Sequence, residues 1–110
     1  MKRGEIWTVA GSGGPYSSKP RPCVIVQDDR FDATLSVTVC PFTTDSTDVP
    51  LIRPPVEPSP LNGLAVPCRL QADKVTTTRR SNLGQRVGRL SAEDMVRLER
   101  SLLVFLGFGG

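Results

Sequence analysis

The sequence contains no histidine, the side chain most often used as a general acid or base near neutral pH and the commonest zinc ligand. Its three cysteines form no Cys-x-x-Cys pair, and each lies in an apolar stretch. This pattern predicts buried, reduced thiols rather than metal ligands. We therefore expect no metal site, no cofactor and no catalytic histidine.

Long apolar runs are missing as well. No stretch of about 18 consecutive apolar residues is present that would span a bilayer. The first residues, Met1 to Glu5, contain no apolar signal core. We therefore expect a cytoplasmic protein without a membrane segment. A length of 110 residues suits one hydrophobic core, so residues 1–110 are predicted to form a single domain.

Positive charge is unevenly distributed along the chain. The net charge is +3, but beyond residue 68 eight basic residues stand against four acidic ones, whereas residues 28–48 lean acidic. Guanidinium groups match the geometry of phosphate oxygens, so the basic half is compatible with a nucleic-acid partner. A solvated protein surface explains the same distribution equally well.

Short apolar runs separated by glycine-rich and proline-rich segments predict a mostly β fold. Pro41 is expected to end a strand, and the proline-rich segment Asp45–Pro60 is expected to be a long loop with at most an edge strand near Leu51–Arg53. The strands are predicted at Ile6–Ala10, Cys23–Val26, Leu35–Cys40, Gly63–Leu70 and Asp73–Thr78.

The carboxyl-terminal part predicts one helix, from Ala92 to Leu106. Ser91 is its expected N-cap, apolar residues recur at helical spacing after it, and Gly107 is expected to end it. Strands followed by a single helix favour a small, partly open β-barrel. Residues 102–108 are apolar on every face of the helix, which predicts a homodimer.

Several motifs occur in a fixed order over nearly the whole chain, and together they resemble the MazF/PemK toxin family. The family's opening strand and its Arg-Pro strand match Arg3–Trp7 and Arg21–Val26. The three later motifs match Val39–Thr44, Ala72–Thr77 and Val87–Ser91.

This resemblance implies an SH3-like barrel, a two-fold dimer and sequence-specific cleavage of single-stranded RNA. The implied reaction is metal-independent attack of the ribose 2′-hydroxyl on the adjacent phosphate. It leaves a 2′,3′-cyclic phosphate and a 5′-hydroxyl, and inhibits translation and growth. The resemblance also implies a type II toxin–antitoxin system, with a MazE-like antitoxin whose acidic carboxyl-terminal segment covers the RNA groove.

The family's catalytic positions fall on Arg21 and Thr43. The residues expected to bind the substrate are Ser18, Lys19, Thr44, Lys74, Thr76 and Thr77. Pro20 and Pro22 stiffen the backbone on either side of Arg21, so its guanidinium is expected to be aimed rather than free. A preorganised cation with neutral donors stabilises the extra negative charge of a pentacovalent phosphorane, and an internal nucleophile needs no metal.

The chain departs from the family pattern at three places. The loop before Arg21 lacks the acidic residue of many relatives, Lys74 replaces a glutamine, and Thr76 replaces a basic residue. Lys74 is a candidate to supply the missing charge from a neighbouring position, but side chains alternate across a strand, so in the predicted strand it would face the other way. The general base is not identified by these motifs.

Two other functions remain open at this point. Gyrase poisons share the fold but depend on a tryptophan at the carboxyl end, whereas this chain ends in Phe108-Gly109-Gly110 and its one tryptophan is Trp7. A catalytically inactive RNA-binding barrel is the other alternative, and would bind RNA without cutting it.

Overall fold

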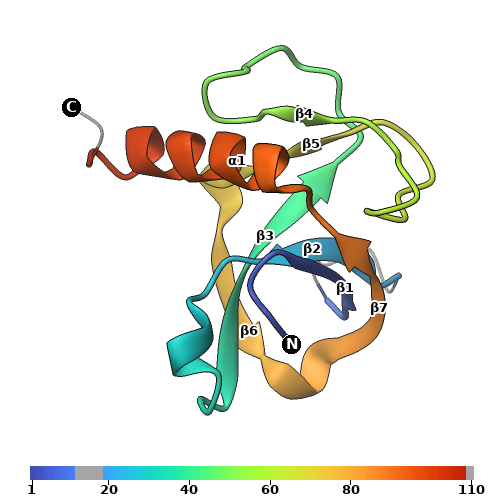
Figure 1. The fold of residues 1–110 in the computed structure, drawn as a ribbon, viewed down its shortest axis with the longest axis vertical. Helices are drawn as coiled ribbons and strands as arrows, with labels where there is room; N and C mark the ends of the chain where they lie inside the picture. The colour runs from blue at the N-terminus through green and yellow to red at the C-terminus, as the bar shows by residue number, and fades with distance from the viewer. Residues whose placement is uncertain (12–18, 109–110) are drawn as a thin grey trace.

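The longest strand, β3 (Ser36–Thr43), organises the fold, because three other strands pair with it. The structure is a computed structural model that describes residues 1–11 and 19–108. In this part of the chain seven strands form one curled sheet in the order β4-β5-β3-β2-β1-β7, with β6 also paired to β3 (Figure 1). The other strands are β1 (Glu5–Val9), β2 (Arg21–Ile25), β4 (Pro55–Val56), β5 (Cys68–Leu70), β6 (Thr76–Arg79) and β7 (Leu83–Arg89). The predicted mostly β fold with a terminal helix is confirmed.

Alternate residues of β3 supply two separate hydrophobic clusters. Val37 and Val39 are buried on one face with residues from β1 and β2. Cys40 and Phe42 point to the opposite face, where they pack in the larger cluster that includes the helix. Successive side chains of a strand point to opposite faces, so this one strand fixes both clusters at once.

The helix α1 (Ala92–Phe105) packs on the larger cluster through Met95 and Leu98. The Ser91 hydroxyl accepts a hydrogen bond from the Asp94 backbone N–H at 3.1 Å, as the expected N-cap should. The helix ends one residue earlier than predicted, and Gly107 follows in the left-handed conformation that glycine tolerates best, with φ of +84°. No helix among the described residues has the length and apolar character required to cross a bilayer.

The expectation that Pro41 ends its strand is wrong. Pro41 lies inside β3 and faces Cys23 of β2. On its other side β3 changes partner, from β6 at Val39 to β5 at Phe42. Pro41 falls in the gap between these two pairings, so no ladder hydrogen bond requires the N–H that proline lacks.

Several predicted strands are shorter than expected or displaced. Residues 51–53 form a turn, and the short edge strand is β4, two residues further on. Only the last three residues of the predicted strand Gly63–Leu70 are extended into β5, and the stretch expected at Asp73–Thr78 begins as a 3₁₀ turn, η2 (Ala72–Lys74), before β6. Leu35, expected to face the core, lies outside β3 and is exposed.

Strand β7 was not predicted from the sequence. Its seven residues include two glycines and two arginines, so the sequence shows no regular apolar alternation there. In the structure none of the seven is buried. The strand pairs with β1 through a register with two irregularities. Gly88 lies against the loop between β4 and β5, where a β-carbon would lie 2.5 Å from backbone atoms of Leu61 and Asn62.

We predict that Gly88→Ala destabilises the protein by about 2–3 kcal/mol, because the added methyl group meets backbone that cannot rotate away. Gly84 is the matched control in the same strand, since a β-carbon there meets one side-chain atom at close range, the Thr8 hydroxyl oxygen at 2.7 Å, while the Thr8 carbonyl oxygen lies at 3.9 Å. Gly84→Ala should therefore have the smaller effect. Urea unfolding of both variants measures the difference, and equal stabilities would show that the packing at Gly88 is not tight.

Candidate RNA-binding cavity and catalytic residues

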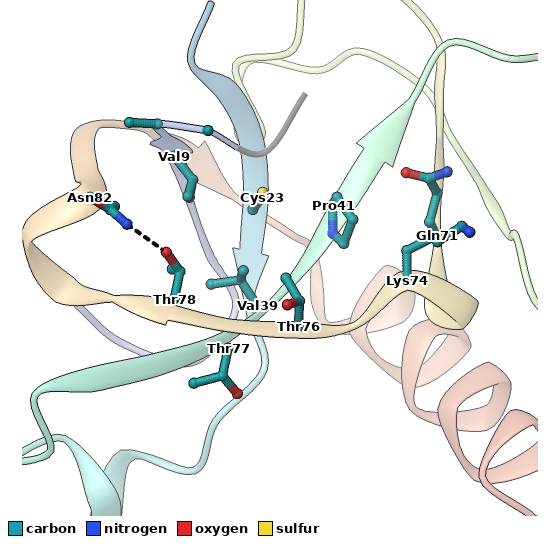
Figure 2. A pocket seen from close by; sticks show the side chains of 12 residues that line it. Val9, Cys23, Val39, Pro41, Gln71, Lys74, Thr76, Thr77, Thr78 and Asn82 are labelled. Atoms are coloured by element: carbon teal, nitrogen blue, oxygen red, sulfur yellow. Dashed lines mark hydrogen bonds between the residues drawn. The ribbon is translucent and has the colours of Figure 1, made fainter. Parts of the chain in front are cut away.

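A cavity of about 610 Å³ opens beside the β1, β2, β3 and β6 strands. Its apolar floor is formed by Val9, Cys23, Val39 and Pro41. Polar side chains surround this floor, and they come from β6 and from the 3₁₀ turns at either end of it (Figure 2). They are Gln71, Lys74, Thr76, Thr78 and Asn82. The cavity thus combines an apolar base with hydroxyl, amide and ammonium groups, a composition typical of ligand sites.

Alternation along β6 decides which threonines face the cavity. Thr76 and Thr78 project on its side, whereas the side chain of Thr77 points away (Figure 2). The Thr77 and Thr38 hydroxyls lie 3.0 Å apart, within hydrogen-bonding distance, on the opposite face of the sheet. Thr77 therefore borders the cavity, but its hydroxyl is engaged with Thr38 on the opposite face of the sheet.

Lys74 and Thr76 both border the cavity. The expected alternation of a strand does not apply to Lys74, because it lies in η2 rather than in an extended segment. Its side chain is exposed and is the one charged side chain among the described residues that line this cavity. The cavity is therefore positive at one end.

Arg21 and Thr43 lie at the edge of the same face, on β2 and β3. The last paired residues of these strands toward this end are Cys23 and Pro41, which belong to the cavity floor. Continuing the antiparallel register by two residues matches Arg21 with Thr43. Residues two apart on a strand share a face, so both belong to the side on which the cavity opens. Arg21 is exposed and Thr43 is half-buried.

Thr43 and Thr44 also border a smaller hollow of about 190 Å³ beside β4 and β5. The Thr43 hydroxyl oxygen accepts a hydrogen bond from the Asp45 N–H at 3.1 Å, which leaves its own proton available to a ligand. Arg69 of β5 pairs with Thr43 and lines this hollow, but Asp45 and Glu57 line it too and Asp48 lies 3.6 Å from the Arg69 guanidinium. These carboxylates offset the charge of Arg69.

The two remaining predicted binding residues lie before β2. Lys19 is exposed and is not among the residues that border either hollow. Ser18 lies outside the described residues. The structure thus brings Lys74 and Thr76 together in the lining of the larger cavity. Arg21 and Thr43 are not among the described residues that line it, but they lie two residues from Cys23 and Pro41 of its floor, and Thr44 borders the smaller hollow with Thr43.

The η2 turn that carries Lys74 is anchored by an ion pair. Two hydrogen bonds, of 3.1 and 3.0 Å, run from the Arg53 guanidinium to the Asp73 carboxylate, and both side chains are largely shielded from solvent. Hydrogen bonding from Arg53 lowers the pKa of Asp73 from its usual value. Asp73 is consequently held as a carboxylate in a structural pair, next to the residue that gives the cavity its charge.

The thiols are not poised for nucleophilic chemistry. Cys23, Cys40 and Cys68 are buried, as predicted. Burial raises the pKa of Cys40 to about 12 and also raises the pKa of Cys68. Among the described residues, no three side chains of histidine, cysteine, aspartate or glutamate are grouped as metal ligands would be.

Sequence reasoning missed two polar residues at the far end of the cavity. The Asn82 side-chain amide donates a hydrogen bond of 2.9 Å to the Thr78 hydroxyl (Figure 2). Thr78 follows directly on the family motif at Ala72–Thr77, and Asn82 lies in η3 (Arg80–Asn82), before the unpredicted strand β7. Only the sheet register brings both against the cavity floor, so the sequence carried no signal for Asn82.

Comparison with known proteins identifies the relatives of this chain. A family model described as "PemK-like, MazF-like toxin of type II toxin-antitoxin system" matches residues 2–106. The chain is 59% identical, over the full length of both proteins, to a Mycolicibacterium smegmatis protein named "Probable endoribonuclease MazF". It is 31% identical to "Endoribonuclease MazF9" of Mycobacterium tuberculosis, over 96% of each chain.

Solved structures share the fold. "Mycobacterium tuberculosis toxin MazF-mt6" superimposes with a TM-score of 0.78 at 24% identity, over 94% of this chain and 96% of that one. "Endoribonuclease in complex with its cognate antitoxin from Mycobacterial species" gives a TM-score of 0.77 at 23% identity, over 97% and 95%. The curled sheet with one terminal helix is therefore the fold of these toxins.

We predict that Asp73→Asn lowers the free energy of unfolding by about 1–2 kcal/mol at pH 7, because it removes the charged partner of Arg53. The pKa of Asp73 is lowered in the folded protein, so its contribution is present above the unfolded pKa and is lost as the pH falls through the folded pKa. The difference in free energy of unfolding between wild type and variant should accordingly be smaller in acid. Urea titrations at pH 7 and pH 3 measure it.

Asp48→Asn is the control for this change, because the Asp48 carboxylate is exposed and pairs with Arg69 only at 3.6 Å. It should alter stability little at either pH. A loss for Asp73→Asn that is no larger than the loss for Asp48→Asn would contradict the structural role of the Arg53–Asp73 pair.

Proposed function

The chain belongs to the PemK-like, MazF-like toxins of type II toxin–antitoxin systems, and we propose that it cuts single-stranded RNA without a metal, through attack of the 2′-hydroxyl on the neighbouring phosphate. Its function as a toxin–antitoxin endoribonuclease follows from the family and from relatives that carry that name. The chemistry of the cut and the residues that perform it are our proposal.

The observation that carries this proposal is the register between β2 and β3. Extended by two residues beyond the Cys23–Pro41 pair, it matches Arg21 with Thr43 next to the cavity floor, which supports a joint role for the two side chains at one phosphate. Pro20 and Pro22 flank Arg21, and the Thr43 backbone is held by β5. A fixed cation beside a hydroxyl donor suits a phosphate whose negative charge rises in the transition state.

The division of roles follows from the chemistry of the two groups. The guanidinium group of an arginine carries a positive charge and several N–H donors, so Arg21 binds the non-bridging oxygens and stabilises the phosphorane. Thr43 donates one neutral hydrogen bond to the same phosphate. Lys19, Lys74 and Thr76 bind the flanking RNA, and the attacking oxygen belongs to the substrate, so the protein need supply no nucleophile.

A binding toxin without catalysis, like the gyrase poisons, is the second candidate, and the environment of Trp7 does not support it. The indole N–H donates to the Glu5 carboxylate at 3.1 Å, and the side chain is half-buried in β1 beside the smaller cluster. Trp7 therefore stabilises the sheet and is not displayed at the carboxyl end, as the alternative requires.

We further propose that the toxin works in the cytoplasm as a homodimer and is silenced there by an antitoxin with an acidic segment. The carboxyl-terminal part of α1 and the residues after it expose five large apolar side chains, which suit a subunit interface. They are Leu103, Val104, Phe105, Leu106 and Phe108. The described residues that line the cavity include a lysine and no acidic side chain, so the cavity attracts an anionic chain as well as RNA.

We predict that Arg21→Ala reduces single-turnover RNA cleavage roughly 100- to 1,000-fold, because the variant loses the charge stabiliser of the transition state. Thr43→Val should reduce cleavage less, since it removes one neutral donor. Primer extension on a long single-stranded RNA with excess chelator measures both. Circular dichroism should show the same folded spectrum as wild type, because Arg21 is exposed.

Arg30→Ala is the matched control for lost positive charge. Arg30 is exposed on η1 (Asp29–Phe31), and its guanidinium pairs with Asp28 away from the cavity. This variant should cleave at the wild-type rate. Near-normal cleavage by Arg21→Ala would refute the catalytic role of Arg21.

For the dimer, multi-angle light scattering at micromolar concentration should give twice the monomer mass of 11.9 kDa. Phe105→Glu should shift the protein toward monomer, because the side chain of Phe105 is 48% exposed and a charge there would be buried in the interface. Leu35→Glu changes an exposed apolar residue just before β3, outside the hollow that Val104 lines, and should leave the mass unchanged. A monomeric wild type would remove the dimer proposal.

A further inference from the structure

The two ends of the cavity differ chemically. At one end Lys74 and Gln71 extend from the η2 side, and at the other Thr78 and Asn82 form a hydrogen-bonded pair (Figure 2). The apolar floor lies between them. No acidic side chain is among the described residues that line this cavity, so its charged end is favourable for an anion.

The Asn82–Thr78 hydrogen bond fixes which groups face the cavity. The Asn82 amide nitrogen donates to the Thr78 oxygen at 2.9 Å, so the amide cannot rotate freely. The Thr78 hydroxyl then has its own proton left to donate. Within the described part of the chain no hydrogen bond engages the Asn82 amide oxygen, which stays an acceptor. The pair thus offers a donor and an acceptor side by side.

A neighbouring donor and acceptor is the pattern that reads the edge of a nucleobase. The apolar floor suits the faces of a base and a ribose, which are less polar than the edges. Lys74 at the opposite end suits the phosphate. A volume of about 610 Å³ lies within the range of cavities that enclose small ligands.

The cavity also lies next to the proposed site of cleavage. Cys23 and Pro41 belong to its floor, and Arg21 and Thr43 follow them two residues away on the same faces of β2 and β3. A nucleotide in the cavity would therefore be a close neighbour of the phosphate that Arg21 contacts.

We propose that this cavity binds one nucleotide flanking the cleaved phosphate, with its phosphate toward Lys74 and its base against Thr78 and Asn82. Asn82 and Thr78 select the base at that position of the RNA. This assignment rests on the proposed endoribonuclease function, since it gives the specificity of the same site.

The test compares the cleavage sites of wild type, Asn82→Ala and Thr78→Val on one long single-stranded RNA, with all 5′ ends mapped by sequencing. Each variant removes one group that would face the base and leaves Arg21 in place. We expect the preference for one base, at one fixed position beside the cut, to fall roughly tenfold in each variant, which lies within the range of about 5- to 150-fold that a good bidentate contact to a base edge provides. The rate at the best sites should change much less.

Ser81→Ala is the control, because Ser81 is exposed beside Asn82 and does not line the cavity. It should retain the wild-type preference. Thermal unfolding checks that all variants are folded.

The outcomes separate the two proposals. If wild type cuts RNA and both cavity variants keep its base preference at every position, the assignment of Asn82 and Thr78 is overturned while the proposed function stands. An equal loss of rate at all sites without a change of preference also overturns it. If wild type cuts no RNA, the proposed function itself fails.

Discussion

The change of partner along β3 is the constraint on which the rest of the structure depends. One edge of this strand pairs with β2, while the other pairs first with β6 and then with β5. Pro41 lies between the pairings with β6 and β5, where no ladder hydrogen bond requires the N–H that proline lacks. Because β6 and β5 separate there, the chain between them turns through η2 and brings Lys74 to the cavity. The same register carries Arg21 toward Thr43.

This arrangement divides the charges of the molecule into those that hold the fold and those available to a ligand. Asp73 is tied to Arg53 by two hydrogen bonds, and Glu5 accepts from the Lys2 N–H and the Trp7 indole while it pairs with Arg86. These side chains are committed to joining distant segments of the chain. Lys74 is exposed at the apolar floor and Arg21 is exposed two residues from it, and the lining found within the described residues contains no acidic side chain. Such an environment favours the binding of a phosphate.

The sequence predicted those parts of the fold that depend on local signals. Ser91 and Gly107 mark the ends of α1 because capping and left-handed turns need those residue types. The strands β1 and β2 follow apolar runs and were placed within a few residues. Strand β7 could not be predicted, since its stability comes from pairing with β1 and from the close approach of Gly88 to another loop, and neither contact is local. The prediction that Pro41 ends its strand is wrong for the same reason, because the gap that accommodates Pro41 is formed by β5 and β6, which lie far from it in the sequence.

In the candidate site, too, only the residues marked by local motifs could be predicted from the sequence. Family motifs directed attention to Arg21, Thr43, Lys74 and Thr76, but Asn82 enters the cavity only because η3 returns the chain beside Thr78. The account as a whole is tested most directly by the chemistry of the cut ends, determined on RNA incubated with the purified protein and excess chelator. It predicts a 2′,3′-cyclic phosphate on one fragment and a 5′-hydroxyl on the other. Fragments with a 3′-hydroxyl and a 5′-phosphate, or cleavage that stops with chelator, would contradict it.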